Sequence, residues 1–365
     1  MDLSVVVPTL NGRDRLAACL DSLAAHAPDA EVIVVNGPSA DGTTGMVRDR
    51  DDVDVLVEIS DRTVNVARNA GIETATGDVI ALVDYDNRIT PAWVDGVLGG
   101  LDRADVVTGP VTPVETPDDD VDDRGDDRDD TAGRDRDETA GRDEDETAAT
   151  DEDETAATDE DETDPGETRA GDKPDGEIDS VDEPERKRIA GRDVTYFPGG
   201  NVAFRRETLR DLDGFDEYLH TGGARDAAHR LAHMDCTVAW DTDVAVRTEP
   251  PSRRAADGGR SDRDWEWKYR ALSYRLLKNY GVRPTVVGRT VKHAVLDAGS
   301  VARDVLDGEA TPSRWVGNGR DVVFGIAGGS SDGLVARAQD RSPARNPNGI
   351  SKRADRAVAK YDRRE

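Results

Sequence analysis

The chain has 365 residues with 78 Asp or Glu against 48 Lys or Arg, a formal net charge of −30. The segment from Glu115 to Lys187 holds 34 of the acids and only 9 of the bases, which leaves 44 acids and 39 bases elsewhere. Because the remainder is nearly balanced, a basic face for nucleic acid is not expected. The excess of Asp, and of Arg over Lys, is typical of a salt-adapted, halophilic cytoplasm and also of a GC-rich genome.

Cysteine content and hydropathy indicate the cellular compartment in which the chain is expected. Cys19 and Cys236 lie in unrelated contexts, which predicts neither a disulfide framework nor a metal site. No charged segment precedes an apolar stretch at the start, so no signal peptide is expected. No apolar run approaches the roughly 18 residues of a membrane span. These features predict a cytoplasmic protein.

The predicted elements alternate between strand and helix from the first residues. Leu3–Val7 is a short apolar strand, and apolar residues from Leu16 to Leu23 recur at helical spacing. Glu31–Val35 is a second buried strand, Val53–Ile59 a third, and a short helix begins near Thr63. Strand, helix and strand in this length form a βαβ unit with a right-handed crossover. The pattern predicts an α/β fold.

The stretch from Val79 to Asn87 carries the clearest candidate site. Val79–Val83 is an unbroken apolar run that ends in Asp84-Tyr85-Asp86-Asn87. Ligands of open α/β sheets bind beyond the carboxyl ends of the strands, and residues i and i+2 of an extended segment point the same way. Asp84 and Asp86 can therefore face one site, where two hard oxygen ligands suit Mg²⁺ or Mn²⁺. The alternative is a solvated acidic turn.

Two phosphate-binding motifs are missing from the sequence. No G-x-G-x-x-G follows the first strand, so a dinucleotide cofactor is not supported, and no G-x-x-x-x-G-K-[ST] occurs. If phosphates bind at this sheet edge, a metal held by Asp84 and Asp86 must neutralise them.

Four motifs together resemble the family 2 glycosyltransferases. They are VVVPTLN, EVIVVNGPSADGT, VARNAGIETATGDVIALVDYDN and GGNVAFRRETLRDLDGFDEYL, in that order along the chain. The resemblance extends from Met1 to about Glu249, apart from the acidic segment. It implies the GT-A fold, a Rossmann-like mixed sheet with helices on both faces. It also implies a nucleotide-diphosphate sugar donor and inversion at the anomeric carbon.

The resemblance also implies site residues. Asp84 and Asp86 match the metal-binding pair, with Mg or Mn as the cofactor. The family usually has Asp where this chain has Asn36, so a base or ribose contact is expected to differ here. The donor nucleotide is expected to bind at Pro8, Thr9, Asn11, Asn36, Asp41 and Arg68.

The catalytic base is the point at which sequence and family pattern disagree. The family has a Glu-Asp pair with an Arg six residues after the Asp, and here Ala224 stands six residues before Arg230. Asp226 is the only carboxylate between Gly222 and Arg230. We therefore assign the base role to Asp226.

An acidic repeat interrupts the predicted domain. Five copies of an eight-residue unit, beginning with DRDDTAGR, run from Asp127 to Gly166. They carry almost no apolar residues and cannot offset their ordering entropy, so residues 117–184 are interpreted as a disordered insertion. A Ca²⁺-binding interpretation lacks the glycine and register of an EF-hand loop.

The C-terminal part, residues 251–365, is predicted to be a mainly helical region following the 1–250 domain. Trp265–Tyr280 and Val286–Leu306 show helical spacing with Lys and Arg interleaved. Basic amphipathic helices with Trp and Tyr can lie at a membrane interface, and the alternative is packing on the chain's own domain. Peripheral contact with the cytoplasmic face of the membrane is thus one expectation.

The resemblance implies an inverting hexosyltransferase that acts by single displacement on an acceptor hydroxyl. Salt-adapted composition adds a similarity to archaeal glycosyltransferases that extend lipid-linked (dolichol phosphate) glycans for protein N-glycosylation. Cell-surface polysaccharide assembly is a related interpretation. The competing hypothesis is a non-catalytic GT-A-like binding scaffold, in which Ala224 marks a lost base.

Overall fold

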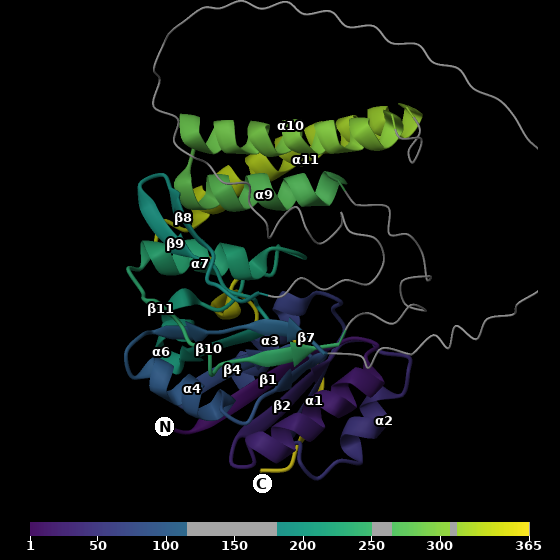
Figure 1. Cartoon of the computed structure of the whole chain (residues 1–365), viewed down its shortest axis with the longest axis vertical. Coiled ribbons are helices and arrows are strands. Elements are labelled where there is room, and N and C mark those ends of the chain that lie inside the picture. The colour runs from purple at the N-terminus through teal and green to yellow at the C-terminus, as the bar shows by residue number, and fades with distance from the viewer. Residues whose placement is uncertain (115–180, 250–264, 307–311, 365) are drawn as a thin grey trace, which may run out of the picture. The chain divides into compact units, whose positions relative to one another are not determined.

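The computed structural model describes residues 1–114, 181–249, 265–306 and 312–364 (Figure 1). The described residues all belong to one compact unit. The acidic repeats predicted to be disordered lie outside the described residues.

A mixed sheet of eight strands forms the centre of this unit. Its order is β11 (Val238–Trp240), β6 (Val106–Thr108), β10 (Asn201–Arg205), β4 (Val79–Val83), β1 (Leu3–Thr9), β2 (Glu31–Asn36), β3 (Val55–Ile59) and β13 (Ala357–Asp362). The strands β4, β1, β2 and β3 are parallel to one another, so their carboxyl ends meet at one edge. β10 is antiparallel to both of its neighbours.

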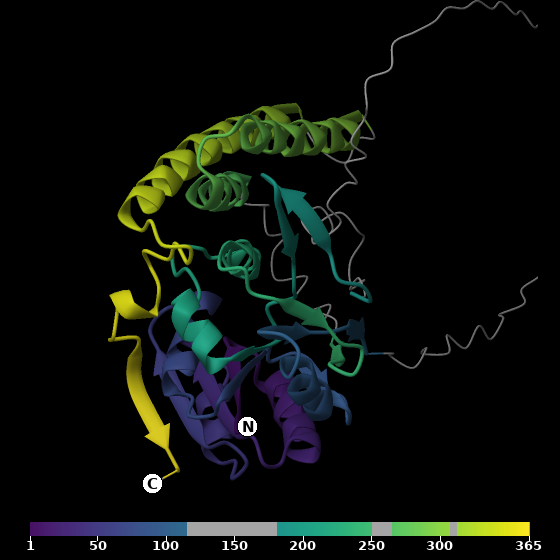
Figure 2. The same cartoon turned by 90° about the vertical axis from the view of Figure 1, so that its left-hand side faces the viewer.

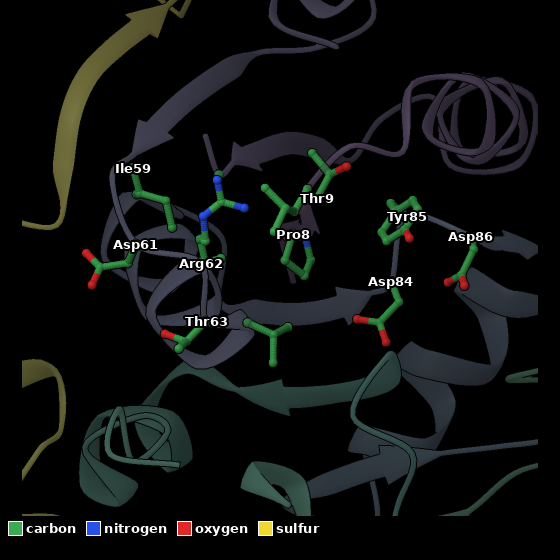
Figure 3. A pocket seen from close by; sticks show the side chains of 13 residues that line it. Pro8, Thr9, Ile59, Asp61, Arg62, Thr63, Asp84, Tyr85 and Asp86 are labelled. Carbon is green, nitrogen blue, oxygen red and sulfur yellow. The ribbon is translucent and has the colours of Figure 1, made fainter. Parts of the chain in front are cut away.

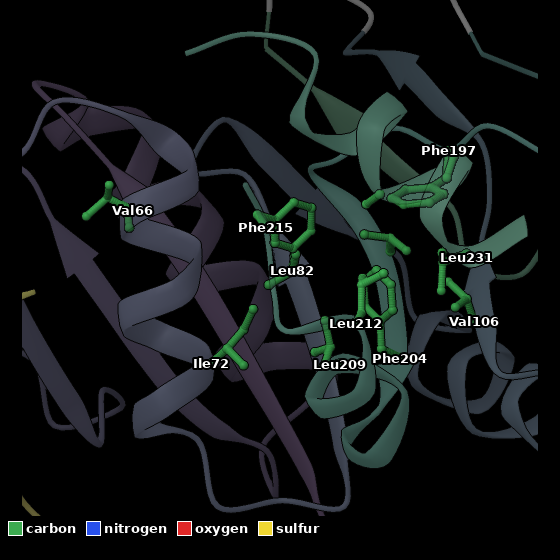
Figure 4. Close-up of a cluster of buried hydrophobic side chains, with 14 of the residues drawn as sticks. Val66, Ile72, Leu82, Val106, Phe197, Phe204, Leu209, Leu212, Phe215 and Leu231 are labelled. Carbon is green, nitrogen blue, oxygen red and sulfur yellow. The ribbon is translucent and has the colours of Figure 1, made fainter. Parts of the chain in front are cut away.

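Side chains of successive strand residues enter different cores because their directions alternate. Val5 and Val7 of β1 pack with α1 (Arg13–His26), α2 (Thr43–Arg48) and α4 (Trp93–Leu101). Val6 faces the other core, which contains α3 (Val64–Thr74), α6 (Arg206–Leu212) and α7 (Gly223–His233). Figure 4 shows part of this second core, where Leu82, Phe204 and Phe215 lie close together. The predicted mixed sheet with helices on both faces is confirmed.

Two small sheets flank the large one. One joins β5 (Asn87–Ile89), β12 (Val246–Thr248) and β7 (Val111–Pro113), and the other is the hairpin of β8 (Arg186–Ile189) and β9 (Arg192–Thr195). The chain leaves the large sheet between β6 and β7 at Gly109-Pro110, where a Cβ on Gly109 would lie 2.2 Å from the Val244 carbonyl oxygen.

The C-terminal region begins with three helices, which confirms its predicted helical character. They are α9 (Trp265–Tyr280), α10 (Pro284–Leu306) and α11 (Pro312–Gln339), and they form a layer of their own (Figure 2). Trp265, Tyr269 and Leu276 of α9 join the core that α7 also enters. None of the described helices combines the length and apolarity needed to cross a membrane.

The last residues of the chain return to the large sheet. After the short 3-10 helix η1 (Ile350–Lys352), strand β13 pairs antiparallel with β3 and becomes the edge of the sheet. Sequence analysis had placed no strand here. The division of the chain into domains at residue 250 stays a prediction.

Candidate functional site

A cavity of about 200 Å³ opens at the edge where the parallel strands end (Figure 3). Three segments supply most of its wall because β1, β3 and β4 all end there. The lining residues are Pro8, Thr9, Leu10, Gly37, Ile59, Asp61, Arg62, Thr63, Val64, Ala67, Asp84, Tyr85 and Asp86. The cavity therefore brings together four residues that the sequence nominated: Pro8, Thr9, Asp84 and Asp86.

Asp84 is held from two sides. Its Oδ1 accepts a hydrogen bond from the buried Arg68 guanidinium on α3 at 3.1 Å. A Cβ built on Gly200 would lie 2.1 Å from Asp84 Oδ2, so no residue larger than glycine fits there. Gly200 thus lies directly against the Asp84 carboxylate.

Asp86 has an environment that suits a cation. Desolvation by burial raises the pKa of Asp86, and the negative charge of Asp84 raises it further, against smaller lowering effects of a backbone hydrogen bond and of Arg15. A divalent cation would relieve the repulsion between the two carboxylates, and their hard oxygens fit Mg²⁺ or Mn²⁺. Among the described residues, no group of three or more His, Cys, Asp or Glu side chains is arranged to hold a metal.

Asn11 and Asn36 connect two loops and do not line the cavity. Asn11, whose φ is 53°, accepts a hydrogen bond from the Ala40 amide at 2.8 Å. The buried Asn36 accepts from the Ser39 hydroxyl at 2.7 Å and donates to Thr44 Oγ1 at 3.0 Å. Both side chains therefore shape the loops after β1 and β2, and their donor-binding role stays a prediction.

Asp41 stabilises the start of α2. Its Oδ1 accepts from the Thr43 amide at 3.1 Å and the Thr43 hydroxyl at 2.6 Å, while Oδ2 accepts from the Arg13 amide at 3.0 Å. Desolvation acts to raise the pKa of Asp41, but these hydrogen bonds outweigh it and lower the pKa. The ionised Asp41 side chain thus holds the loop before α2 in place, and it does not line the cavity.

Arg68 lies behind the cavity wall, next to the start of α7. Its guanidinium lies 5.4 Å from the centre of the Phe215 ring. A Cβ on Gly199 would lie 2.9 Å from Arg68 Nη2 and 3.1 Å from the Ala224 Cβ. The structure therefore brings Ala224, the position that matches the family's base, beside the Arg68–Asp84 pair.

Asp226 lies in a different environment. Its side chain is 0% exposed and accepts hydrogen bonds from Lys278 Nζ at 2.8 Å, Arg230 Nε at 2.8 Å and Asn279 Nδ2 at 2.9 Å. Desolvation acts to raise the pKa of Asp226, but the charges of Lys278 and Arg230 outweigh it and lower the pKa. Both carboxylate oxygens are engaged, and Asp226 does not line the cavity. Its role as a base stays a prediction, and these contacts favour a structural ion pair.

The cation that neutralises Asp226 also neutralises a second buried carboxylate. Lys278 Nζ of α9 donates to Asp216 Oδ2 at 2.6 Å, and the Tyr274 hydroxyl donates to the same oxygen at 2.8 Å. Asn348 Nδ2 donates to Asp216 Oδ1 at 2.9 Å. We call Asp216, Asp226, Arg230 and Lys278 the buried charge network, and it connects α7, α9 and the turn after α6.

Sequence analysis missed several cavity residues. Asp61, Arg62 and Thr63 follow β3, and the rule that parallel strands end at one edge was sufficient to nominate them. Tyr85 lies between the two predicted metal ligands, and a Cβ on Gly12 would lie 2.2 Å from its ring. The ion pair of Asp61 with Arg353 at 2.8 Å had no signal in the sequence, because Arg353 is near the other end of the chain.

Comparison with known proteins identifies a family for the chain that carries this site. The family model described as Glycosyl transferase family 2 matches residues 4–213, more than half of the chain. The chain belongs to glycosyl transferase family 2. The matched range contains Pro8, Thr9, Arg68, Asp84 and Asp86, but it ends before Asp226.

Curated relatives agree with the family. Glycosyltransferase AglE of Haloferax volcanii is 30% identical over 100 residues, which are 26% of this chain and 33% of that protein. The uncharacterized glycosyltransferase YibD of Escherichia coli is 31% identical over 100 residues, 26% of this chain and 29% of its own length. The chain thus matches about a third of the length of these relatives.

A solved structure agrees with the fold. S. aureus TarS 1-349, crystallised in complex with UDP-GlcNAc, superposes with a TM-score of 0.50 over 93% of this chain and 92% of that chain, at 15% identity. At this identity the likeness shows the fold alone, and it confirms the GT-A architecture that the resemblance implied.

Proposed function

We propose that this family 2 chain transfers a sugar from a nucleotide-diphosphate donor to an acceptor, with inversion at the anomeric carbon. The observation that carries the proposal is the cavity in which Pro8 and Thr9 of β1 meet Asp84 and Asp86 of the β4 end. An open cavity beside two carboxylates that lack full charge compensation suits a nucleotide whose diphosphate is bound through a metal.

The chain's own residues would position the donor. Asp84 and Asp86 would hold Mg²⁺ or Mn²⁺, which when bound neutralises charge on the departing nucleoside diphosphate. Arg68 fixes the orientation of Asp84, and the absence of a side chain at Gly200 lets the loop before β10 pack against that carboxylate. Preorganisation of this kind lowers the cost of binding the diphosphate.

The role of Asp226 bears on the chemical class of the acceptor. A hydroxyl acceptor needs a base to take its proton, and Asp226 is the carboxylate that α7 offers, although its oxygens are engaged. A phosphate monoester, whose second pKa is about 6, is already an anion at neutral pH and needs no base. Ala224 beside Arg68 is compatible with such an acceptor, which suits a lipid-linked phosphate of the dolichol type at the cytoplasmic face of a membrane.

Product analysis tests the proposal. The purified full-length chain is incubated with Mn²⁺, a panel of UDP- and GDP-sugars and either a polyprenyl phosphate or a glycan acceptor. We expect a chelator-sensitive glycosylated product whose anomeric configuration, read by NMR, is opposite to that of the donor. A product with retained configuration would contradict the inverting mechanism.

The second candidate function is a binding scaffold without catalysis. It is favoured by Ala224 at the family's base position and by the engagement of Asp226 in the buried charge network. Nucleotide-sugar binding that is metal-dependent, with neither transfer nor hydrolysis for any donor in the panel, would select this candidate.

A further inference from the structure

A second cavity lies at the C-terminal end of α11. Its volume is about 400 Å³, and it is lined by Leu334, Arg337, Ala338, Arg341 and Arg345. None of these residues lines the cavity beside Asp84 and Asp86, which we call the donor cavity. Because three of the five lining residues are arginine and none is an acid, we call the second one the arginine cavity.

Backbone carbonyl groups hold two of the three arginines. Arg337 Nη1 donates to the Lys278 oxygen at 3.0 Å and to the Asn279 oxygen at 2.8 Å, near the end of α9. Arg345 Nη1 donates to the Asn279 oxygen at 3.4 Å. A guanidinium group has five N–H donors, so these bonds orient both side chains and leave further donors for a ligand. A neutral carbonyl group does not cancel the positive charge.

The three arginines have no acidic partner within the described residues. The side chain of Arg341 is exposed and forms neither a hydrogen bond nor an ion pair there, and neither Arg337 nor Arg345 forms an ion pair. The acid next to Arg341 in the sequence, Asp340, accepts two backbone amide hydrogen bonds from the following loop, both at 2.8 Å. Asp340 does not line the cavity.

The positive charges around the arginine cavity repel one another. Burial lowers the pKa of Arg337, and the charge of Arg283 lowers it further. Burial also lowers the pKa of Arg345, together with the charges of Arg337 and Arg192 and against the opposite effect of Asp340. Arginine stays protonated at neutral pH, so positive charge is in excess here and an anion would relieve the repulsion.

Structural roles account for only part of this cluster. Arg192 pairs with a surface aspartate, and Arg283 donates to a backbone carbonyl group in the β8–β9 hairpin. Arg337 lies in the last turn of α11, where a cation interacts favourably with the helix dipole. Arg341 and Arg345 lie beyond the end of that helix, and the described residues give the Arg341 side chain no structural partner.

We propose that the arginine cavity binds the phosphate groups of an anionic ligand. The planar guanidinium group matches the oxygens of a phosphate or a carboxylate. A phosphate monoester carries a charge of about −1.5 to −2 at pH 7, whereas one carboxylate carries a single charge and would leave more of the positive charge uncompensated. A phosphate-bearing ligand is therefore the class that fits three arginines without an acid.

This inference goes beyond the proposed function and does not depend on it. Diphosphate binding in the donor cavity would use a metal on Asp84 and Asp86, whereas the arginine cavity has no acid to hold a metal. Metal-free buffer and substitutions in the arginine cavity therefore test this inference alone. Absence of sugar transfer would contradict only the proposed function.

The test is calorimetric titration of the full-length chain with inorganic pyrophosphate. The buffer is freed of metal on a chelating resin and kept at a fixed ionic strength at which circular dichroism shows a folded chain. Arg341→Gln should weaken pyrophosphate binding about tenfold, because one charge-assisted contact is lost. Arg341→Lys keeps the charge but not the paired donors, so its affinity should be intermediate. Neither variant should change the melting temperature.

Arg210→Gln is the matched control. Its side chain is 77% exposed on α6 and lines neither cavity, so this variant loses the same charge and should bind pyrophosphate as the wild type does. Equal affinities of the wild type and Arg341→Gln would overturn the proposal. So would equal weakening in Arg210→Gln and Arg341→Gln, which would indicate a nonspecific effect of charge.

Further probes distinguish the sources of the phosphate. Glycerol 3-phosphate presents a phosphate monoester in solution, and vesicles of phosphatidic acid with phosphatidylcholine present one at a lipid surface. Binding of the free phosphates that depends on Arg341 would indicate a soluble ligand, and vesicle flotation alone that depends on Arg341 would indicate a lipid head group. Binding of neither would overturn the proposal. Triglutamate that binds more tightly than pyrophosphate would also overturn it and assign the cavity to an acidic peptide.

Discussion

Two pairs of aspartates in this protein have opposite surroundings. Asp84 and Asp86 line the cavity, and the only ion pair that either forms within the described residues is that of Asp84 with Arg68. Asp216 and Asp226 are fully buried and share Lys278, while Arg230 adds a second cation. The first pair carries uncompensated negative charge, and the second pair is neutralised by the protein.

The difference shows how a ligand site is distinguished from a structural one. A buried carboxylate must be paired or protonated, because desolvation of an isolated charge is costly. The protein supplies that pairing for Asp216 and Asp226, whereas it leaves Asp86 with a raised pKa beside an open cavity. Of these two pairs, it is the cavity pair that a cation from outside the chain would complete under the proposed function.

Removal of the shared cation should produce the largest effect. Lys278→Met keeps the length of the side chain but leaves two buried carboxylates competing for Arg230. We expect the free energy of unfolding to fall by about 3–5 kcal/mol, measured by urea denaturation. Lys360→Met is the control, because Lys360 pairs with Asp362 at the surface and should change the value by less than about 1 kcal/mol. Equal losses of unfolding free energy in Lys278→Met and Lys360→Met would contradict the structural role of the buried pair.

Asp226→Asn removes the charge of one aspartate of the buried pair and so tests that pair directly. The amide keeps the shape of the side chain but leaves Lys278 and Arg230 undercompensated, so the free energy of unfolding should fall by about 1–3 kcal/mol. Asp95→Asn, an exposed acid in the first turn of α4, controls for the loss of a helix-dipole interaction. If turnover instead falls by about 10²–10⁴-fold with an unchanged melting temperature, Asp226 is the base.

Asp86→Asn tests the cavity pair. The substitution removes one of two hard ligands, so the affinity for UDP or GDP in the presence of Mn²⁺ should fall at least about tenfold in calorimetry. The melting temperature should hold or rise, because repulsion with Asp84 is lost. Asp151→Asn in the acidic repeat is the control for charge alone. Wild-type affinity that survives chelation of the metal would exclude this assignment.

The acidic segment should contribute least to stability. Deletion of Asp118 to Asp172 shortens the connection between Val114 and Val181, and the closure entropy of a shorter connection changes the free energy of unfolding by only about 1 kcal/mol. We expect cooperative unfolding and metal-dependent nucleotide binding to persist, as followed by circular dichroism and calorimetry. Loss of cooperative unfolding would show that the segment belongs to the fold and not to a loop.

Local patterns were sufficient for the elements that build the cavity. The apolar runs of β1, β2 and β4 and the helical spacing of α1 predicted a parallel α/β core, and the position of Asp84 and Asp86 at a strand end placed them at its edge. These features depend on residues that are neighbours in sequence, and the periods of helix and strand report them directly. The motif order also predicted the family.

Contacts between distant residues were decided by the tertiary structure alone. Whether Asp226 faces the cavity or the interior depends on how α7 is rotated about its axis, and Lys278 on α9 determines that burial from 52 residues away. The pairing of β13 with β3 joins segments about 300 residues apart. Asn36 was predicted to bind the donor nucleotide, and the structure adds that its side-chain amide hydrogen-bonds with Ser39 and Thr44. A side chain's partners follow from packing, which a one-dimensional pattern does not contain.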